Sequence, residues 1–395
     1  MPSSTSSDDA NRTADRLSGM GTTIFADMSA LALAHDAVNL GQGFPDTDGP
    51  DEVIEAAVTA LRSGEHNQYA PGPGIPPLRR AIADHQAHWW GQQVDPDTEV
   101  LVTTGATEAI AAAILGLVNP GDEVVALDPY YDSYTATIAM AGGIRVPCTL
   151  PPPDFRFDAQ RLHDAITPRT RVILLNTPHN PTGTVLDRAD LAAVADVAIE
   201  HDLVVVTDEV YEHLVFDDAV HVPIATLPGM AERTLTISSA GKTFALTGWK
   251  IGWAVGPDDL VTSARLAKQF LTYTSGAPLQ PAIAMALGLP DTYFTQLRAD
   301  LQDRRDQLVA GLTDIGLEPN APAGGYFVTT DIRPLGFDDG LDFCRTLPER
   351  VGVAAIPHQV FWEDEAMGRP FVRWAFCKRA DVLDRGLHRL AGLAG

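Results

Sequence analysis

Lysine is the rarest charged residue in this chain of 395 residues, with only four copies against 24 arginines. Chemistry that requires an amine nucleophile therefore has four candidates, Lys242, Lys250, Lys268 and Lys378. Basic residues are also few overall: 28 Lys and Arg face 52 Asp and Glu, which gives a formal net charge of −24. Nucleic acid and anionic membrane surfaces are recognised by basic patches, so we expect neither as a partner.

Cysteine is equally scarce. The three cysteines, Cys148, Cys344 and Cys377, are far apart and odd in number, which indicates reduced thiols and a cytoplasmic protein. No apolar run approaches the length of a membrane span, and the longest, residues 109–118, suits a buried helix. The polar residues 1–20 lack the apolar core of a secretory signal, so we expect a disordered tail there.

Short β-branched runs alternate with longer Ala- and Leu-rich segments between about residues 46 and 290. This alternation predicts an α/β fold whose mostly parallel sheet lies between helices. We expect strands at residues 100–103, 123–127, 171–175, 203–207 and 234–237, and helices at residues 107–118, 188–200 and 291–311.

A chain of this length favours two domains. We expect a large domain over residues 46–289. A smaller α+β domain is expected from residues 21–45 together with residues 290–395, because short strands and helices follow the long helix pattern at residue 291.

Polar and small residues follow four of the predicted strands, at Gly105, in residues 176–183, at Asp208 and in residues 239–242. In a parallel sheet, ligands bind in the crevice beyond the carboxyl ends of the strands. The four loops are therefore expected to meet around one crevice.

Each of these loops carries residues suited to a particular chemistry. Lys242 follows a strand and small residues, so its amine could form an imine and later move a proton. Gly105 precedes a helix whose free N–H groups suit a phosphate, and Ser239 with Lys250 could complete that anion site. Asp208 ends an apolar strand, where it is either a helix cap or ion-pair partner, or the partner of a protonated pyridine nitrogen.

Other polar residues are expected to be structural. The 11 histidines show no metal-ligand spacing, so we expect no metal site, and His85 with His88 is expected on an exposed helix face. We interpret His179 as structural, and Lys268 and Lys378 as ordinary solvated surface lysines.

Three motifs together carry a family resemblance: HNPTG (179–183), DEVY (208–211) and SxxK followed by TGWKxGW (239–253). The chain resembles the class I aminotransferases of fold type I, which use pyridoxal 5′-phosphate (PLP). The resemblance covers nearly everything after the tail. It implies a seven-stranded sheet in the large, PLP-binding domain, and it makes Lys242 the Schiff-base lysine and the acid and base of the proton shift.

The resemblance also implies roles for other residues. Asp208 contacts the pyridine nitrogen, Asn180 and Tyr211 contact the ring oxygen, and Tyr131 stacks on the ring. The phosphate is held by Ala106, Thr107, Ser239 and Lys250, and by Tyr69 of a neighbouring subunit, which implies a homodimer with shared active sites. Arg373 binds the substrate α-carboxylate as a bidentate fork, helped by Gly43. Phe25, Phe44, Tyr131 and Tyr326 are candidates for the substrate pocket, although core packing explains Phe25 and Tyr326 equally well.

One residue departs from the common family pattern, because Lys250 stands where arginine is usual. A lysine keeps the charge but not the planar fork. The kynurenine and glutamine transaminase branch tolerates this change, and the NLGQGFPD and TGWKIGW motifs also point to that branch.

The expected function is transfer of an α-amino group from an amino acid to a 2-oxo acid by a ping-pong mechanism. The motifs most resemble N-succinyldiaminopimelate aminotransferases of lysine biosynthesis, with 2-oxoglutarate as acceptor. Transamination of kynurenine, glutamine or methionine is the close alternative. A dedicated aspartate enzyme is disfavoured because residues 271–278 lack an arginine for a second carboxylate.

Two further alternatives remain open. A PLP-dependent C–S β-lyase would keep every cofactor contact. A PLP-sensing transcription regulator is disfavoured by the acidic charge and by the short segment that precedes the family match.

Overall fold

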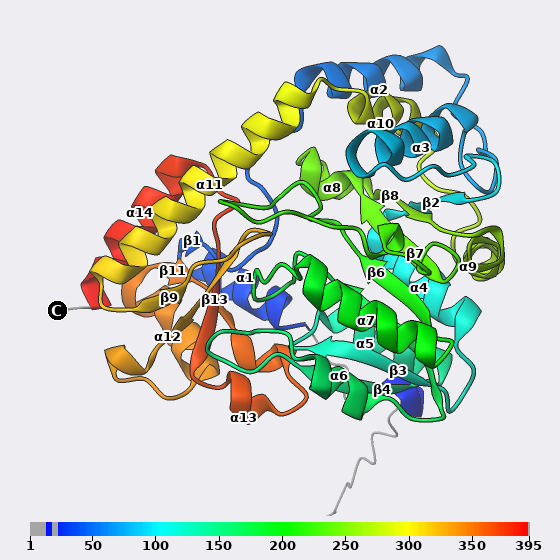
Figure 1. Ribbon diagram of the computed structural model, residues 1–395. Helices are drawn as coiled ribbons and strands as arrows, with labels where there is room; N and C mark the ends of the chain where they lie inside the picture. Colours follow the sequence, from blue (N-terminus) through cyan, green and yellow to red (C-terminus); the bar gives the residue numbers. More distant parts are fainter. Residues whose placement is uncertain (1–12, 18–22, 394–395) are drawn as a thin grey trace, which may run out of the picture.

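The computed structural model describes residues 13–17 and 23–393. At its centre is a seven-stranded sheet in the order β2-β8-β7-β6-β5-β3-β4 (Figure 1). Every neighbouring pair is parallel except the two pairs that β8 forms with β2 and β7. The predicted mostly parallel sheet is thereby confirmed. Its strands are β2 (Val100–Thr104), β3 (Glu123–Asp128), β4 (Ile144–Thr149), β5 (Thr170–Asn176), β6 (Val204–Asp208), β7 (Thr234–Ser239) and β8 (Ile251–Val255).

Helices cover both faces of this sheet, because its strands are apolar on both sides. Along β3, Val124 and Ala126 pack against one group of helices, while Val125 and Leu127 pack against the other. The first group is α4 (Gly105–Leu117), α5 (Asp132–Ala141) and α9 (Asp258–Leu271), and the second is α6 (Ala159–Ala165) and α7 (Arg188–Glu200). A third core lies over β2 and β8, beneath α2 (Asp51–Ser63), α3 (Pro76–Trp90) and α10 (Gln280–Leu287).

A smaller, antiparallel sheet has the order β12-β13-β10-β9. Its strands are β9 (Glu318–Asn320), β10 (Phe327–Asp331), β12 (Ile356–Pro357) and β13 (Phe371–Ala375). Beside it, β1 (Val38–Asn39) pairs in parallel with β11 (Val353–Ala354), which joins the beginning of the chain to its last third. The long helix α11 (Asp291–Asp314) runs along this part of the molecule beside α14 (Ala380–Leu390), as Figure 1 shows.

The remaining elements are short. The helices are α1 (Ile24–Ala34), α8 (Ala240–Thr243), α12 (Gly340–Val351) and α13 (Glu365–Gly368). The 3-10 helices are η1 (Asp15–Leu17), η2 (Ile224–Thr226), η3 (Thr247–Trp249), η4 (Arg333–Leu335), η5 (His358–Phe361) and η6 (Ala391–Leu393). Among the described residues, no helix combines the length and the apolar character that crossing a bilayer requires.

The two sheets are the basis on which we propose the domain division. The seven-stranded sheet lies within residues 46–289. The smaller sheet and the β1–β11 pair draw only on residues 21–45 and 290–395. Most of the tail expected over residues 1–20 lies outside the described residues.

Candidate active site

A cavity of about 330 Å³ lies at the carboxyl ends of the central strands. All four predicted loops contribute to its lining, through Gly105, Asn180, Asp208 and Lys242 among others. The smaller sheet closes the cavity with Phe327 and Arg373. Residues that are far apart in the sequence therefore share one chamber.

Lys242 enters this chamber from α8, the single turn that follows β7. Its Nζ donates a hydrogen bond to the carbonyl oxygen of Gly43 at 3.3 Å and lies 5.4 Å from the ring centre of Tyr326. Burial lowers the pKa of Lys242 to about 8, with the nearby charge of Arg373 adding to the effect and that of Asp208 opposing it. At pH 7 the amine is still mostly protonated, but it loses its proton more readily than an ordinary lysine.

Asp208 ends β6 with its carboxylate buried in the cavity wall. The hydroxyl of Tyr134 donates to its Oδ2 at 2.7 Å. Burial raises the pKa of Asp208 to about 6, while the bond from Tyr134 and the charge of Lys242 hold it below the value that burial alone would give. No helix of the described chain begins at Asp208, so the helix-cap interpretation does not apply.

The expected anion site forms where α4 begins. Gly105 has the positive φ of +71°, and its N-cap neighbour Thr104 makes no capping bond with its side chain, so the first turn keeps unsatisfied N–H groups. Lys250 Nζ donates to Thr107 Oγ1 at 3.3 Å. A Cβ atom at Gly252 would lie only 2.5 Å from the carbonyl carbon of Gly105, so glycine is required where β8 meets this turn.

Arg373 is fully buried on β13, with 1% of its surface exposed. One guanidinium nitrogen donates to Asn180 Oδ1 at 2.9 Å and another donates to the carbonyl oxygen of Gly41 at 3.2 Å, while Nε has no partner among the described residues. The ring of Phe327 lies 3.9 Å from the guanidinium carbon. Burial lowers the pKa of Arg373 to about 10, which still leaves it cationic at neutral pH. The structure thus holds a rigid cation against the cavity.

A chain of hydrogen bonds connects this arginine to the central sheet. Asn176 donates through Nδ2 to the carbonyl oxygen of Asp208 at 2.8 Å and accepts from the backbone N–H of Asn180 at 2.7 Å. Asn180 in turn accepts from Arg373. These hydrogen bonds therefore connect the backbone of Asp208 to the guanidinium of Arg373 through Asn176 and Asn180.

Most of the aromatic residues predicted for the site line the cavity, but Tyr326 and Tyr69 do not. Phe25, Phe44, Tyr131 and Tyr211 line the cavity, as do Ala106, Ser239 and Gly43. Tyr326 lies behind the wall and donates its hydroxyl proton to the carbonyl oxygen of Gly43 at 2.8 Å. Tyr69 lies outside this cavity, with 81% of its surface exposed and its ring edge-on to that of Tyr273 at 5.3 Å.

Sequence reasoning missed three residues of the site: Tyr134, Asn176 and Phe327. The first lies in the opening turn of the helix that follows Tyr131, and its ring contacts that of Tyr131 edge-on at 5.6 Å. Asn176 ends a strand at the crevice edge. Phe327 is offset by one from the aromatic residue that was predicted, and the alternation of side chains along β10 puts it in the cavity instead.

Three expectations about polar residues are wrong. His85 is buried, with 4% of its surface exposed, because Trp89 and Phe294 pack around it. Lys268 and Lys378 are also buried rather than solvated. Their ammonium groups donate to backbone carbonyl groups, including that of Phe44 for Lys378 at 2.7 Å.

Comparison with known proteins points to one family. The family model for "Aminotransferase class I and II" matches residues 35–390. The "Probable N-succinyldiaminopimelate aminotransferase DapC" of Mycobacterium tuberculosis H37Rv is 55% identical over 97% of this chain and 98% of its own length. The methionine aminotransferase of Escherichia coli K12 is 41% identical over 96% of this chain and 97% of its own. The solved structure of N-succinyldiaminopimelate aminotransferase from Mycobacterium tuberculosis superposes with a TM-score of 0.95 at 55% identity, covering 96% of this chain and all of that one.

Proposed function

The chain belongs to the class I and II aminotransferases, and from this membership we propose that it acts with PLP on N-succinyl-L,L-diaminopimelate. The acceptor is 2-oxoglutarate, the cycle is ping-pong, and the reaction belongs to lysine and diaminopimelate biosynthesis. The observation that carries the substrate assignment is the 55% identity, over nearly the whole length of both chains, to a relative of that name.

The cavity residues fit PLP at both of its charged ends. The uncapped first turn of α4, with Thr107, Ser239 and Lys250, suits the phosphate. The buried carboxylate of Asp208 suits a protonated ring nitrogen, because a cation there offsets the cost of burying the carboxylate. Tyr131, Asn180 and Tyr211 line the space between these ends, and Tyr69 would reach the phosphate from a second subunit.

When bound, PLP supplies an aldehyde that condenses with amines and a ring that withdraws electrons. The chain supplies the proton transfer. With a pKa of about 8, Nζ of Lys242 is about half deprotonated at pH 8, so it could take the proton from the donor α-carbon and pass it to the bound cofactor, and with the oxo acid it would run the same transfer in reverse.

Arg373 binds and orients the substrate. Its two outer nitrogens already hold Asn180 and the backbone at Gly41, so the guanidinium plane is fixed before the ligand arrives. A carboxylate that enters the cavity can pair with the cation through the remaining N–H groups. This fixes the α-carbon relative to Lys242.

A neighbouring cavity favours a long substrate. Its volume is about 540 Å³, and it borders the first cavity at Phe25, which lines both. Arg345, in the lining of the second cavity, is a cation that suits a distal carboxylate.

A donor panel tests the proposal. Glutamate formation from 2-oxoglutarate is measured with N-succinyl-L,L-diaminopimelate, kynurenine, methionine and glutamine as donors. We expect kcat/KM for the succinylated donor to exceed the others at least tenfold. A tenfold preference for methionine, which the 41% identical relative makes the second candidate, would overturn the substrate assignment. Pyruvate released from cystathionine without an oxo acid would instead identify a β-lyase.

We also propose a homodimer. Tyr69 and Phe270 are more than 80% exposed, and Leu266, Leu271 and Tyr273 are about half exposed. Apolar surface of this kind marks interaction sites. Sedimentation should give twice the chain mass of 42.3 kDa, and a monomer at micromolar concentration would refute the proposal. A cytoplasmic location is supported by three buried, free cysteines, and recovery outside the soluble cell fraction would contradict it.

A further inference from the structure

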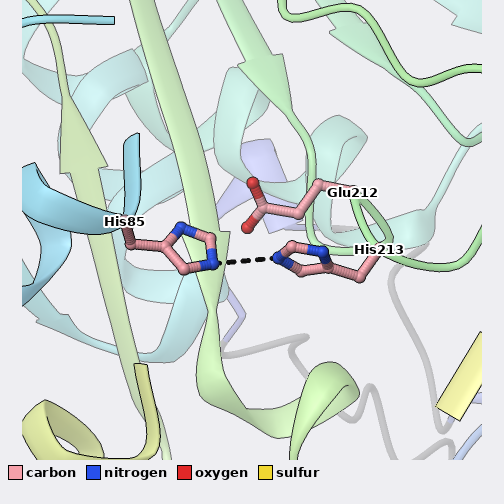
Figure 2. A group of neighbouring side chains, drawn as sticks. All are labelled: His85, Glu212 and His213. Carbon is pink, nitrogen blue, oxygen red and sulfur yellow. Dashed lines mark hydrogen bonds between the residues drawn. The ribbon is translucent and has the colours of Figure 1, made fainter. Parts of the chain in front are cut away.

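Three side chains of the kinds that coordinate metal ions meet on the side of the 209–213 segment that faces away from the active site. His85 comes from the middle of α3, and Glu212 and His213 follow β6 (Figure 2). They are 4%, 3% and 7% exposed, and one nitrogen or oxygen atom from each lies within 4.8 Å of the others. Glu212 and His213 do not line the cavity that holds Lys242.

The donor atoms are well placed. The Nε2 atoms of His85 and His213 face each other at 2.9 Å, so at most one of them carries the shared proton. In Figure 2 the carboxylate of Glu212 is directed toward the gap between the two rings. Ser238 Oγ donates to one of its oxygens at 2.7 Å and Trp90 Nε1 to the other at 2.9 Å. These bonds orient the carboxylate and leave one lone pair free on each oxygen.

The two imidazoles of the cluster are neutral, and one of their nitrogens lacks a partner in the part of the chain that the structure describes. Burial lowers the pKa of His85 to about 4 and that of His213 well below its ordinary value, so both rings are neutral, as metal coordination requires. Nδ1 of His85 is also buried without a partner among the described residues. Mutual hydrogen bonds therefore leave this group incompletely satisfied.

An access route and room for solvent ligands are present. A cavity of about 170 Å³ reaches Glu212 and His213, and its other lining residues include Trp89, Trp90, Phe294, His221 and Arg298. A bound water occupies about 30 Å³, so the cavity accommodates an ion together with its remaining water ligands.

We propose that His85, Glu212 and His213 bind a divalent transition-metal ion, with zinc as the best match to two imidazoles and one carboxylate. Zinc bonds of about 2.0–2.2 Å place neighbouring ligand atoms about 3.3 Å apart. The two Nε2 atoms are 2.9 Å apart and all three ligand atoms lie within 4.8 Å of one another, so the two rings need to separate slightly to admit the ion.

The bound ion has a structural consequence. It cross-links α3 to the segment that begins directly after Asp208 and carries Tyr211 toward the active site. Because the unfolded chain does not preserve this arrangement, binding stabilises the fold.

The test uses tag-free holoenzyme, stripped with a chelator and dialysed against zinc chloride. Mass spectrometry should find about one zinc per chain, and zinc should raise the melting temperature. His85→Gln and His213→Gln should each lower zinc affinity at least tenfold. His88→Gln is the matched control, because His88 is three residues further along α3, is exposed and pairs with Asp291, so this variant should bind zinc normally.

Two results would overturn the site. The first is wild-type protein that retains no zinc after dialysis, which needs no variant to interpret. The second is zinc binding of unchanged affinity in both His85→Gln and His213→Gln. Cofactor absorbance and circular dichroism establish that each variant is folded, and a cobalt spectrum that changes with His213→Gln identifies imidazole coordination independently of stability.

Discussion

Arg373→Lys separates the charge of the cation proposed to bind the substrate from its geometry. The lysine keeps the positive charge but can match neither Asn180 and Gly41 nor two oxygens of a carboxylate at once. Loss of one charge-assisted hydrogen bond costs about 1.5–3 kcal/mol. At 1.4 kcal/mol for each factor of ten, kcat/KM should fall about 10- to 150-fold.

The assay is designed to attribute this loss to the carboxylate. Steady-state rates with the amino acid donor are compared with single-turnover rates for the corresponding amine, which lacks the α-carboxylate. The variant should be impaired with the amino acid and nearly unchanged with the amine. Arg333→Lys, at an exposed arginine paired with Asp331, is the control and should behave as wild type.

Equal losses with both donors would refute the reasoning, since the defect would then not involve the carboxylate. Loss of cofactor absorbance in Arg373→Lys would point instead to a collapsed cavity. A fall of less than threefold would mean that charge alone determines recognition.

Three other substitutions test the remaining parts of the site. Lys242→Ala should fold and melt normally but lose the absorbance of the lysine-bound cofactor, and its turnover should fall by about 10⁴ or more; activity near wild type would remove Lys242 from the mechanism. Lys250→Ala should weaken cofactor retention about 10- to 150-fold in equilibrium dialysis, whereas Lys250→Arg should preserve it; equal retention by both variants would contradict a phosphate contact. Tyr134→Phe removes the donor to Asp208 and so raises the pKa of Asp208 further above 6. In the cofactor-free protein, the loss of stability that accompanies ionisation of Asp208 should therefore extend to higher pH in the variant. Urea unfolding midpoints measured between pH 5 and 8 follow this loss. A pH profile identical to that of wild type would show that the hydrogen bond from Tyr134 does not control the carboxylate.

The sequence predicted the active-site loops well because parallel strands impose a simple rule. Four strand ends with polar or small residues had to meet at one edge, and Gly105, Asp208 and Lys242 do line one cavity. The edge strand β4 and the antiparallel β8 were not individually anticipated. Their role depends on pairing partners that no local pattern specifies.

Contacts made across long sequence separations could not be predicted in the same way. Tyr134 reaches Asp208 across 74 residues, and the local pattern around either residue contains no sign of the other. His85 was misjudged for a related reason. Its helix buries more than one face, and Phe294, more than 200 residues further along the chain, covers the histidine. Burial by a distant segment changes the chemistry of a side chain without changing its local sequence.

The shifted pKa values of Asp208 and Lys242 indicate that burying these two cavity residues costs stability. Asp208 has its pKa raised from 3.8 to about 6, so its contribution to stability is lost as pH rises through about 6, at a cost of roughly 3 kcal/mol. Lys242 has its pKa lowered from 10.5 to about 8, so a similar cost of roughly 3 kcal/mol is present once pH falls below about 8. Between pH 6 and 8 both costs apply together. A ligand that brings a cation to Asp208 and consumes the charge of Lys242 removes both costs, so this pH range is where ligand binding should stabilise the fold most.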